Sequence, residues 1–249
     1  MALAHSPSIV TNGLVLCLDA GNTKSYSAGI STTAWNDLSG RGNNGTLTNG
    51  TYYNSSNGGS IDFDGAQTYP NGTLNISNSQ SLQNTLSTNS FTITSVSKCT
   101  DLTYPKSVFP FWIETYILNN TTAIANRGMS SGDGSNETGF RIEVNNGGTY
   151  FQGTVSHTTV LSTIYHRTIV IDRSNGFKFK YYVNGIFLGE VESTSITGSI
   201  YSSGGLVFGN MYGWTFKGSL YNFSLHNRTL TESEIQQNYN ALKGRFGLT

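Results

Sequence analysis

The chain has 249 residues, with 14 basic and 14 acidic side chains and a formal net charge of zero. Charged residues make up only 11%, so no basic surface is available for phosphates, which argues against nucleic acid as a partner. Polarity comes from Asn, Ser, Thr and 29 Gly, while 13 Phe and 14 Tyr supply the apolar surface that disordered chains lack. This composition is typical of an all-β protein with long polar loops.

The N-terminal segment carries no recognisable targeting signal. The stretch "MALAHSPSIVTNGLVLCLDAG" lacks a basic region, and its apolar run is too short for a signal peptide. No run of about 18 apolar residues predicts a transmembrane segment, so we expect no membrane insertion and assembly in a cytoplasm. Residues 1–13 are either an N-terminal arm or the lead-in to the first strand.

Short runs rich in β-branched and aromatic residues, bounded by Gly, Asn, Asp or Ser, predict β-strands. The runs are 14–18, 60–64, 90–97, 139–144, 165–172, 205–209 and 218–226. No helical period separates them, which favours a two-layer antiparallel sandwich over alternating strands and helices. We find no linker, charge block or internal repeat and predict one domain, 1–249.

Two cysteines and two aspartates raise the question of a metal or a disulfide. Cys17 and Cys99 fit no zinc spacing, and we expect both to be small core residues rather than a bridged pair. Asp62 and Asp64 share one face of a predicted strand and could contribute to a calcium site. The alternative, which we favour, is that Asp64 and Gly65 open a turn. The Asp64 carboxylate would then accept hydrogen bonds from backbone N–H groups of that turn.

Residues 98–122 combine two prolines with a cluster of aromatic side chains. The segment is either an insertion packed on the sandwich or a docking surface for another chain, because aromatic anchors dominate protein interfaces. The interface candidates are Tyr104, Phe109, Phe111, Trp112 and Tyr116.

The segment 177–192 predicts a β-hairpin. Phe177, Phe179, Tyr181 and Val183 alternate with polar positions, so one face is expected to be apolar and the other, with Lys178, Lys180 and Tyr182, to be hydrated. Asn184-Gly185 supplies the two positive φ angles of a type I′ turn.

The glycine-rich segment 209–218 offers Asn210, Tyr212 and Trp214 as an aromatic and amide platform for sugar recognition. The alternative is that Trp214 packs into the sandwich edge beneath a C-terminal helix. Trp35 and Trp112 carry the same ambiguity between core and surface.

One helix is predicted near the C-terminus. Thr231 and Glu234 have capping-box spacing, and Leu230 with Ile235 has the spacing of a hydrophobic staple. Gly244 fits the residue that follows a helix, and the helix is expected to close the edge or end of the sandwich.

Sequence features of catalysis are not found. There is no nucleophile elbow and no phosphate-binding loop, and the four histidines stand too far apart for a metal site. Glycoside hydrolysis needs two carboxyl groups flanking one bond, and the glutamates here are scattered. Glu190 and Glu192 share a strand face, which we interpret as a solvated edge. We predict no catalytic residue, no cofactor and no enzymatic activity.

Five segments resemble a known family when taken together and in order. They are "GLVLCLDAGNTKSY", "WNDLSGRGNNGTLTNG", "SIDFDG", "YYVNGIFLGEVE" and "FKGSLYNFSLHNRTLTESEIQQNY". They resemble the laminin-G-like (LamG) branch of the concanavalin A-like lectin/glucanase superfamily, and in particular LamG-type virion proteins of tailed bacteriophages, leaving about 98–135 unmatched. The resemblance implies a jelly-roll sandwich. Family members often follow "FDG" with an acidic pair, where this chain has Ala66, Gln67 and Thr68.

The resemblance and the polar, neutral composition together imply a non-enzymatic structural protein of a phage virion, such as a capsid decoration or a fibre or tail component. Its partners would be other virion proteins and copies of itself. The alternative is a carbohydrate-binding module for host-surface glycans, and a polysaccharide hydrolase ranks last.

Overall fold

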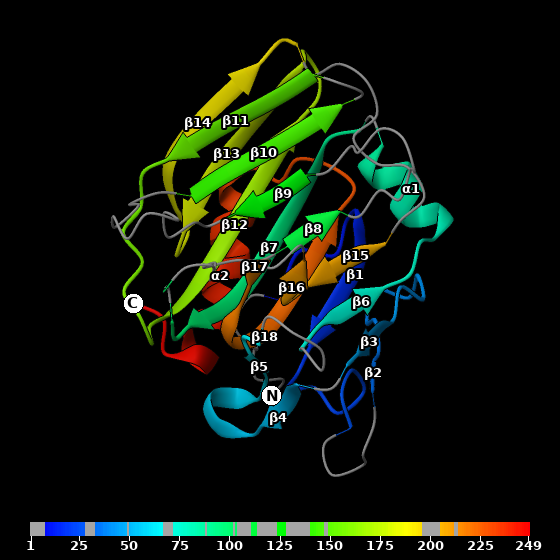
Figure 1. Cartoon of the computed structure of the whole chain (residues 1–249), viewed down its shortest axis with the longest axis vertical. Coiled ribbons are helices and arrows are strands. Elements are labelled where there is room, and N and C mark those ends of the chain that lie inside the picture. The colour runs from blue at the N-terminus through cyan, green and yellow to red at the C-terminus, as the bar shows by residue number, and fades with distance from the viewer. Residues whose placement is uncertain are drawn as a thin grey trace, which may run out of the picture.

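The computed structural model describes residues 8–27, 33–48, 50–66, 72–87, 89–101, 103, 111–113, 124–127, 140–146, 149–195, 205–211 and 214–249. Two antiparallel sheets form a sandwich with a C-terminal helix, which confirms the predicted fold class. Figure 1 shows the sheets as two layers, one in front of the other, with the C-terminal helix, in red, behind them.

Sheet A is the rear layer in Figure 1 and has the order β14-β13-β12-β7-β18-β5-β4, with β1 also paired to β18. Its strands are β1 (Leu14–Asp19), β4 (Thr51–Asn54), β5 (Ser60–Asp64), β7 (Phe91–Cys99), β12 (Ile164–Asp172), β13 (Phe177–Val183), β14 (Ile186–Ser193) and β18 (Lys217–His226). β18 pairs with three strands, β1, β5 and β7, so it joins the N-terminal and C-terminal parts of the chain.

Sheet B is the front layer and has the order β11-β10-β9-β8-β15-β6-β3-β2. Its strands are β2 (Ala34–Trp35), β3 (Gly45–Leu47), β6 (Leu74–Ile76), β8 (Phe111–Ile113), β9 (Ile124–Arg127), β10 (Phe140–Asn146), β11 (Thr149–Val155) and β15 (Leu206–Phe208). Because β8 pairs with both β9 and β15, the segment 98–122 is not wholly an insertion: its residues Phe111–Ile113 are part of the sheet.

The hairpin predicted at 177–192 is confirmed as β13 and β14. Asn184 and Gly185 have φ angles of 50° and 79°, as the type I′ turn requires. The prediction for Tyr182 is wrong: this residue is buried rather than hydrated, because it packs in a cluster with Leu230 and Ile235 next to the C-terminal helix. A strand pattern read by itself cannot show that a helix covers its second face.

The C-terminal helix, α2 (Glu232–Phe246), covers the outer face of sheet A rather than the edge or end of the sandwich. Tyr239, Leu242 and Phe246 pack in one cluster with Val96 of β7 and Tyr221 of β18. The predicted capping box is confirmed by reciprocal hydrogen bonds between Thr231 and Glu234.

The predicted end of α2 at Gly244 is wrong. The helix continues to Phe246, and Gly247, with φ 62°, is the C-terminal cap. Two contacts formed after Gly244 favour the longer helix: Phe246 packs on Tyr221, and Arg245 forms an ion pair with Asp19 at 2.7 Å.

Two further short helices were not predicted. η1 (Ser56–Gly58) is a single turn, and α1 (Gln80–Leu86) has only seven residues. Ser79 caps α1 by accepting a hydrogen bond from the Leu82 N–H, and Leu82 and Leu86 are buried. A helix of two turns is too short to show a clear apolar period in sequence.

Residues 8–13 are attached to α2. The Val10 N–H donates to Asn238 Oδ1 at 2.7 Å, and Gln237 Nε2 donates to the Ser8 carbonyl at 2.7 Å. His226 Nε2 lies 2.9 Å from the Val10 carbonyl oxygen. Of the two interpretations of 1–13, the lead-in to the first strand therefore describes residues 8–13; residues 1–7 lie outside the described part.

The main core lies between the two sheets. Trp35 is fully buried in it, which places this tryptophan in the core and not on the surface. Cys17 and Cys99 are both free and buried, as predicted. Burial, reinforced by the nearby Asp19 and Asp37 carboxylates, raises the pKa of Cys17 to about 12, so the thiol stays protonated and unreactive.

Candidate functional site

The predicted sugar-binding segment forms a small two-stranded ribbon. In chain order this ribbon follows β15 of sheet B and precedes β18 of sheet A. β16 (Asn210–Met211) pairs with β17 (Trp214–Thr215), and Figure 1 shows the pair in the front part of the molecule. The base of the ribbon is closed by a hydrogen bond from the Phe216 N–H to the Gly209 carbonyl oxygen at 2.7 Å. Phe216 also packs edge-on against Phe63, with ring centroids 5.7 Å apart, so the ribbon is anchored in the core.

Gly209 is required at this base. Its φ is 98°, and a Cβ added there would lie 2.3 Å from the Gly72 carbonyl oxygen and 2.7 Å from the Phe63 ring. The close approach of two backbones therefore allows no side chain. This contact fixes where the ribbon leaves the sandwich.

The register of the ribbon separates two of the predicted ligand residues. Asn210 pairs with Thr215 and Met211 pairs with Trp214, and directly opposed residues share one face of an antiparallel ribbon. Asn210 and Trp214 are therefore not paired with each other in the ladder. Of these four residues, Thr215 has a described side chain, and it is fully buried. Tyr212, the third predicted residue, lies outside the described residues.

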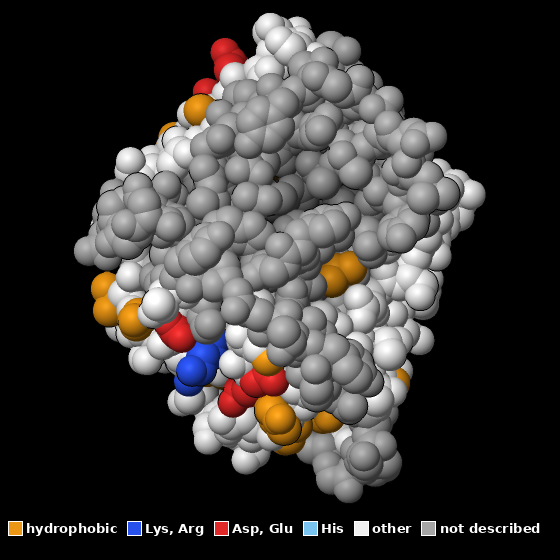
Figure 2. Space-filling view, in the orientation of Figure 1, with side chains coloured by type: hydrophobic (Ala, Val, Ile, Leu, Met, Phe, Trp, Pro, Cys, Tyr) orange, Lys and Arg blue, Asp and Glu red, His pale blue; other side chains and the backbone are white. Residues whose placement is uncertain are grey.

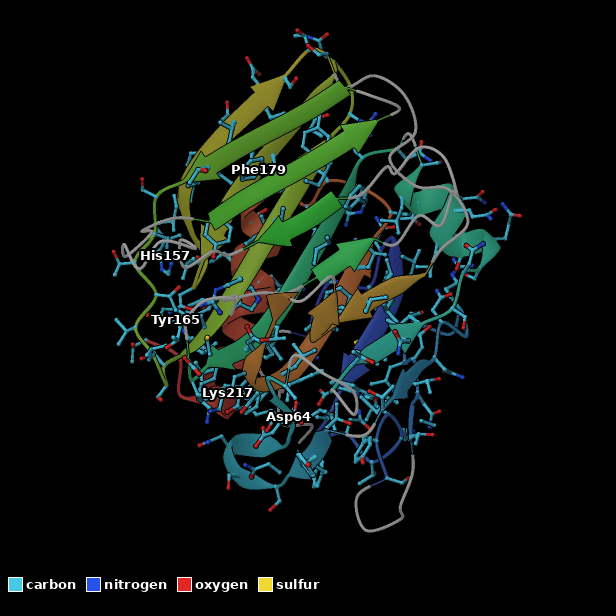
Figure 3. All side chains as sticks on the ribbon, viewed as in Figure 1. Asp64, His157, Tyr165, Phe179 and Lys217 are labelled. Atoms are coloured by element: carbon cyan, nitrogen blue, oxygen red, sulfur yellow. The ribbon has the colours of Figure 1, made fainter. Side chains whose placement is uncertain are left out.

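A group of charged side chains lies at the foot of the ribbon, and local sequence reasoning missed it. Lys217 stands opposite Asp64 in the register of β18 and β5, and its Nζ lies 3.9 Å from an Asp101 carboxylate oxygen. Figure 3 shows Asp64 and Lys217 side by side at the lower end of the molecule, and Figure 2 shows basic and acidic side chains exposed there. These residues are 37 or more positions apart in sequence, so only the strand order brings them together.

Asp64 takes the turn role that the sequence predicts. Its Oδ1 accepts a hydrogen bond from the Ala66 N–H at 2.9 Å, and Gly65 has a φ of 69°. Asp62 plays a different role, because it accepts hydrogen bonds from Asn54 Nδ2 at 2.9 Å and Ser60 Oγ at 2.8 Å. Within the described ranges, no group of three or more His, Cys, Asp or Glu could hold a metal ion.

Asp37 organises a loop that the sequence did not single out. Its two carboxylate oxygens accept hydrogen bonds from the backbone N–H groups of Cys17, Ser39 and Asn43 and from the Ser39 hydroxyl. The "WNDLSGRGNNG" segment is thus a structural motif that ties β1 to the start of sheet B. The only local signal was the Asp-x-Ser spacing of a turn.

The three described histidines, His157, His166 and His226, lie in different environments. His166 is fully buried, its ring nitrogens lack hydrogen bonds, and burial lowers its pKa to about 4. His226 is buried against the Val10 carbonyl oxygen. His5 lies outside the described residues.

Glu190 and Glu192 form the solvated edge that was predicted. Lys178 Nζ lies 3.3 Å from Glu190 and 3.0 Å from Glu192, and Lys180 lies 3.9 Å from Glu190. The pairs cross the exposed face of the β13–β14 hairpin. The carboxylates of Glu190 and Glu192 are therefore paired with surface lysines.

The structure describes the backbone of two of the five aromatic docking candidates. Phe111 and Trp112 lie in β8, in register with Phe208 and Val207 of β15. Tyr104, Phe109 and Tyr116 lie outside the described residues. Since β8 is an interior strand of sheet B, at least two of the candidates contribute backbone to the sandwich itself.

A family model described as the concanavalin A-like lectin/glucanases superfamily (Laminin_G_3) matches residues 71–236. The chain belongs to this superfamily. The matched range includes the residues 98–135 that the resemblance left unmatched, and it begins after "SIDFDG". No curated protein matches the sequence significantly. Among the described residues no helix is long and apolar enough to cross a bilayer.

Solved structures similar to this superfamily member include binding domains of toxins and a domain of an arabinanase. Domain 4 of AbnA, an arabinanase of Geobacillus stearothermophilus solved with arabinotriose, is 15% identical with a TM-score of 0.64, covering 91% of this chain and 98% of that one. The binding domain of Paraclostridial Mosquitocidal Protein 1 is 15% identical (TM-score 0.65, 93% of this chain, 52% of that one). The binding domain of botulinum neurotoxin DC, solved with rat synaptotagmin II, is 13% identical (TM-score 0.66, 94% and 52%). The chain thus spans about half the length of these toxin domains, and the likeness shows a shared fold.

Proposed function

We propose that this chain is a non-catalytic, lectin-type domain that binds glycans through the β16–β17 ribbon. The observation that carries the proposal is the fold shared along 91% of the chain with a domain solved in complex with arabinotriose. Sugar sites combine an aromatic surface with a few hydrogen-bonding groups. The segment 209–218 supplies Trp214 and Tyr212 in sequence, and Asp64 and Lys217 stand opposite each other at the foot of the ribbon.

The state of the carboxylates supports a binding role over hydrolysis. A glycosidase needs one carboxyl group that is free to protonate the leaving oxygen and a second that acts as nucleophile or base. Asp62 accepts two side-chain hydrogen bonds, Asp64 holds a turn, and Glu190 and Glu192 face surface lysines. These hydrogen bonds and ion pairs favour structural roles for the four carboxylates.

A glycan array with purified protein tests the proposal. We expect binding to neutral or acidic oligosaccharides that is lost in Trp214→Ala and retained in Tyr52→Ala, a matched control because Tyr52 is exposed on β4. Circular dichroism would show that both variants are folded. A blank array with folded wild-type protein, or equal binding by both variants, would contradict the proposed site.

We further propose that the domain works as a structural component of a phage virion, as a capsid decoration or a fibre or tail appendage. The five LamG-like segments and the neutral, lysine-poor surface support this location, since many copies must pack closely without repulsion. The pairing of β1 with β18 supports a single domain over 1–249. Other virion proteins and copies of the chain would be its partners.

The aromatic segment 103–116 is the proposed contact with those partners. Deleting it would also remove β8 and break sheet B, so the test uses point substitutions instead. The double variant Tyr104→Ser, Tyr116→Ser should fold and yet be missing from purified particles viewed by electron microscopy. Normal incorporation of this variant would mean that the contact with other virion proteins lies elsewhere on the chain.

A further inference from the structure

A charged side chain lies inside the sandwich, between the two sheets. On β12, Tyr165, Ile169 and Ile171 belong to the main core, and the alternation of the strand places Arg167 on the same face. Arg167 is only 1% exposed. Among the residues whose side chains the structure describes, no Asp or Glu is buried.

Arg167 contacts three hydroxyl groups, those of Ser97, Thr159 and Tyr181. Nη1 donates to Ser97 Oγ at 3.1 Å, and Nη2 lies 3.5 Å from Thr159 Oγ1. Nε has no hydrogen-bond partner. The hydroxyl of Ser95, which stands directly opposite Arg167 in the register of β7 and β12, is also buried without a partner. Two buried polar atoms of one cluster therefore lack the hydrogen bonds that buried groups normally make.

The positive charge is not neutralised by its neighbours. The ring of Tyr165 lies 4.6 Å from the Arg167 Cζ and offers a cation–π contact, which attracts the charge without cancelling it. Burial, together with the positive charge of Arg167, lowers the pKa of His157 to about 4. His157 is therefore neutral at pH 7, and Arg167 supplies the positive charge of the cluster. An isolated buried charge is costly, and proteins usually pair it.

The cluster approaches solvent under the loop 156–163. His157 and Thr159 are half-buried in this loop, whereas Val160 and Leu161 are exposed. The Val160 N–H donates to the Tyr165 hydroxyl at 3.1 Å, and the His157 ring packs edge-on on Tyr165 at 5.4 Å. Figure 3 shows His157 and Tyr165 at the left of the molecule, above Lys217 and Asp64 at the foot of the ribbon.

We propose that Arg167, with Ser95 and Ser97, forms an internal binding site for one small monovalent anion, a carboxylate or a halide. A guanidinium presents N–H groups in a planar fork that fits a carboxylate, and the serine hydroxyls can donate to the same anion. A monovalent ion matches the single positive charge, whereas a divalent phosphate or sulfate would leave a negative charge buried. The carboxylate could belong to an acidic sugar or to a free ion, and the chemistry of the site is the same for both.

Thermal unfolding at constant ionic strength tests the site. Sodium sulfate is replaced stepwise by chloride, acetate or glucuronate at pH 7, and wild-type protein is compared with Arg167→Met in each buffer, so that general salt effects cancel. Anion binding should raise the wild-type Tm by a few degrees relative to the variant. Arg228→Met is the matched control, because Arg228 already pairs with Glu234 at 2.6 Å, and its loss should lower Tm equally in every buffer.

The relative stabilisation by the different anions identifies the source of the carboxylate. Stabilisation by glucuronate at lower concentration than acetate assigns the site to an acidic sugar, and equal effects of chloride and acetate assign it to a free ion. Chloride-35 line broadening by wild-type protein, reversed by acetate, would support the site even if Arg167→Met fails to fold. Absence of line broadening together with an anion-independent wild-type Tm would overturn the proposal, and it would leave the glycan array result unaffected.

Discussion

His166 of β12 packs edge-on against Tyr239 of α2, with 5.9 Å between the ring centroids and no solvent at the imidazole. The contact joins sheet A to the helix on its outer face. Burial favours the neutral imidazole, which lowers the pKa of His166 from 6.5 to about 4.

This contact predicts an acid-sensitive fold. The folded pKa lies below the unfolded value, so the unfolded chain binds more protons between pH 6.5 and 4, and stability falls across that window. We expect His166 to account for a loss on the order of 2 kcal/mol in the free energy of unfolding between pH 7 and pH 4.5. Urea denaturation at the two pH values measures it.

The matched variants for this experiment are His166→Phe and His157→Gln. The first should flatten the pH dependence, because a phenyl ring can pack on Tyr239 without titrating. The second should remove a smaller part of the pH dependence, because the pKa of His157 is also lowered to about 4 but this loop histidine is only half-buried. An unchanged pH profile in His166→Phe would assign the acid sensitivity to other groups, such as His226, whose pKa is also lowered by burial.

The two glycines at the end of α2 should respond in opposite directions to alanine. Gly244 lies inside the helix with open space at its Cβ position, so Gly244→Ala should stabilise the fold by about 1 kcal/mol. Gly247 has a φ of 62°, so Gly247→Ala should destabilise it by about 1 kcal/mol. Chemical denaturation of both variants checks where the helix ends; destabilisation by Gly244→Ala would favour the shorter helix.

The capping box predicts a smaller, local loss. Thr231→Ala removes the acceptor for the Glu234 N–H and should cost about 1 kcal/mol of unfolding free energy. Thr158→Ala, in an exposed loop, is the control and should change stability by less than about 0.5 kcal/mol. Equal effects of the two substitutions would mean that the cap contributes nothing measurable.

Asp37 should be among the most sensitive polar positions of the chain. Asp37→Ala leaves the N–H groups of Cys17, Ser39 and Asn43 without their acceptor, and we expect a loss of about 3 kcal/mol or more. Arg41→Ala, an exposed residue of the same loop, should be nearly neutral. Differential scanning calorimetry compares the two; a neutral Asp37→Ala would show that water replaces the carboxylate.

Much of the fold could be predicted because it is encoded locally. Alternation and turn residues such as Asn184-Gly185 determine where strands begin and end, and Thr231 with Glu234 marks a helix start within four residues. The errors arose where distant segments decide the outcome. Tyr182 is covered by residues near α2, and contacts of Arg245 and Phe246 with β1 and β18 extend the helix past Gly244.

The candidate site could be predicted only in part, for the same reason. The segment 209–218 was recognisable from its glycines and aromatic residues, but the register that separates Asn210 from Trp214 depends on a two-residue ladder. Lys217 and Asp64 meet through strand order, and Arg167 appears in sequence as an ordinary strand arginine. Burial of a charge contradicts the usual preference of arginine for the surface, so pattern reasoning does not find it.

The position of β18 in sheet A has a consequence for how the protein is made. Residues 217–226 pair with residues 14–19, 60–64 and 91–99, so the sheet stays incomplete until residues 217–226 have left the ribosome. Such long-range pairing slows folding and leaves strand edges exposed in the meantime. Truncated translation products that stop before 217 should therefore aggregate or be degraded instead of accumulating as smaller native domains.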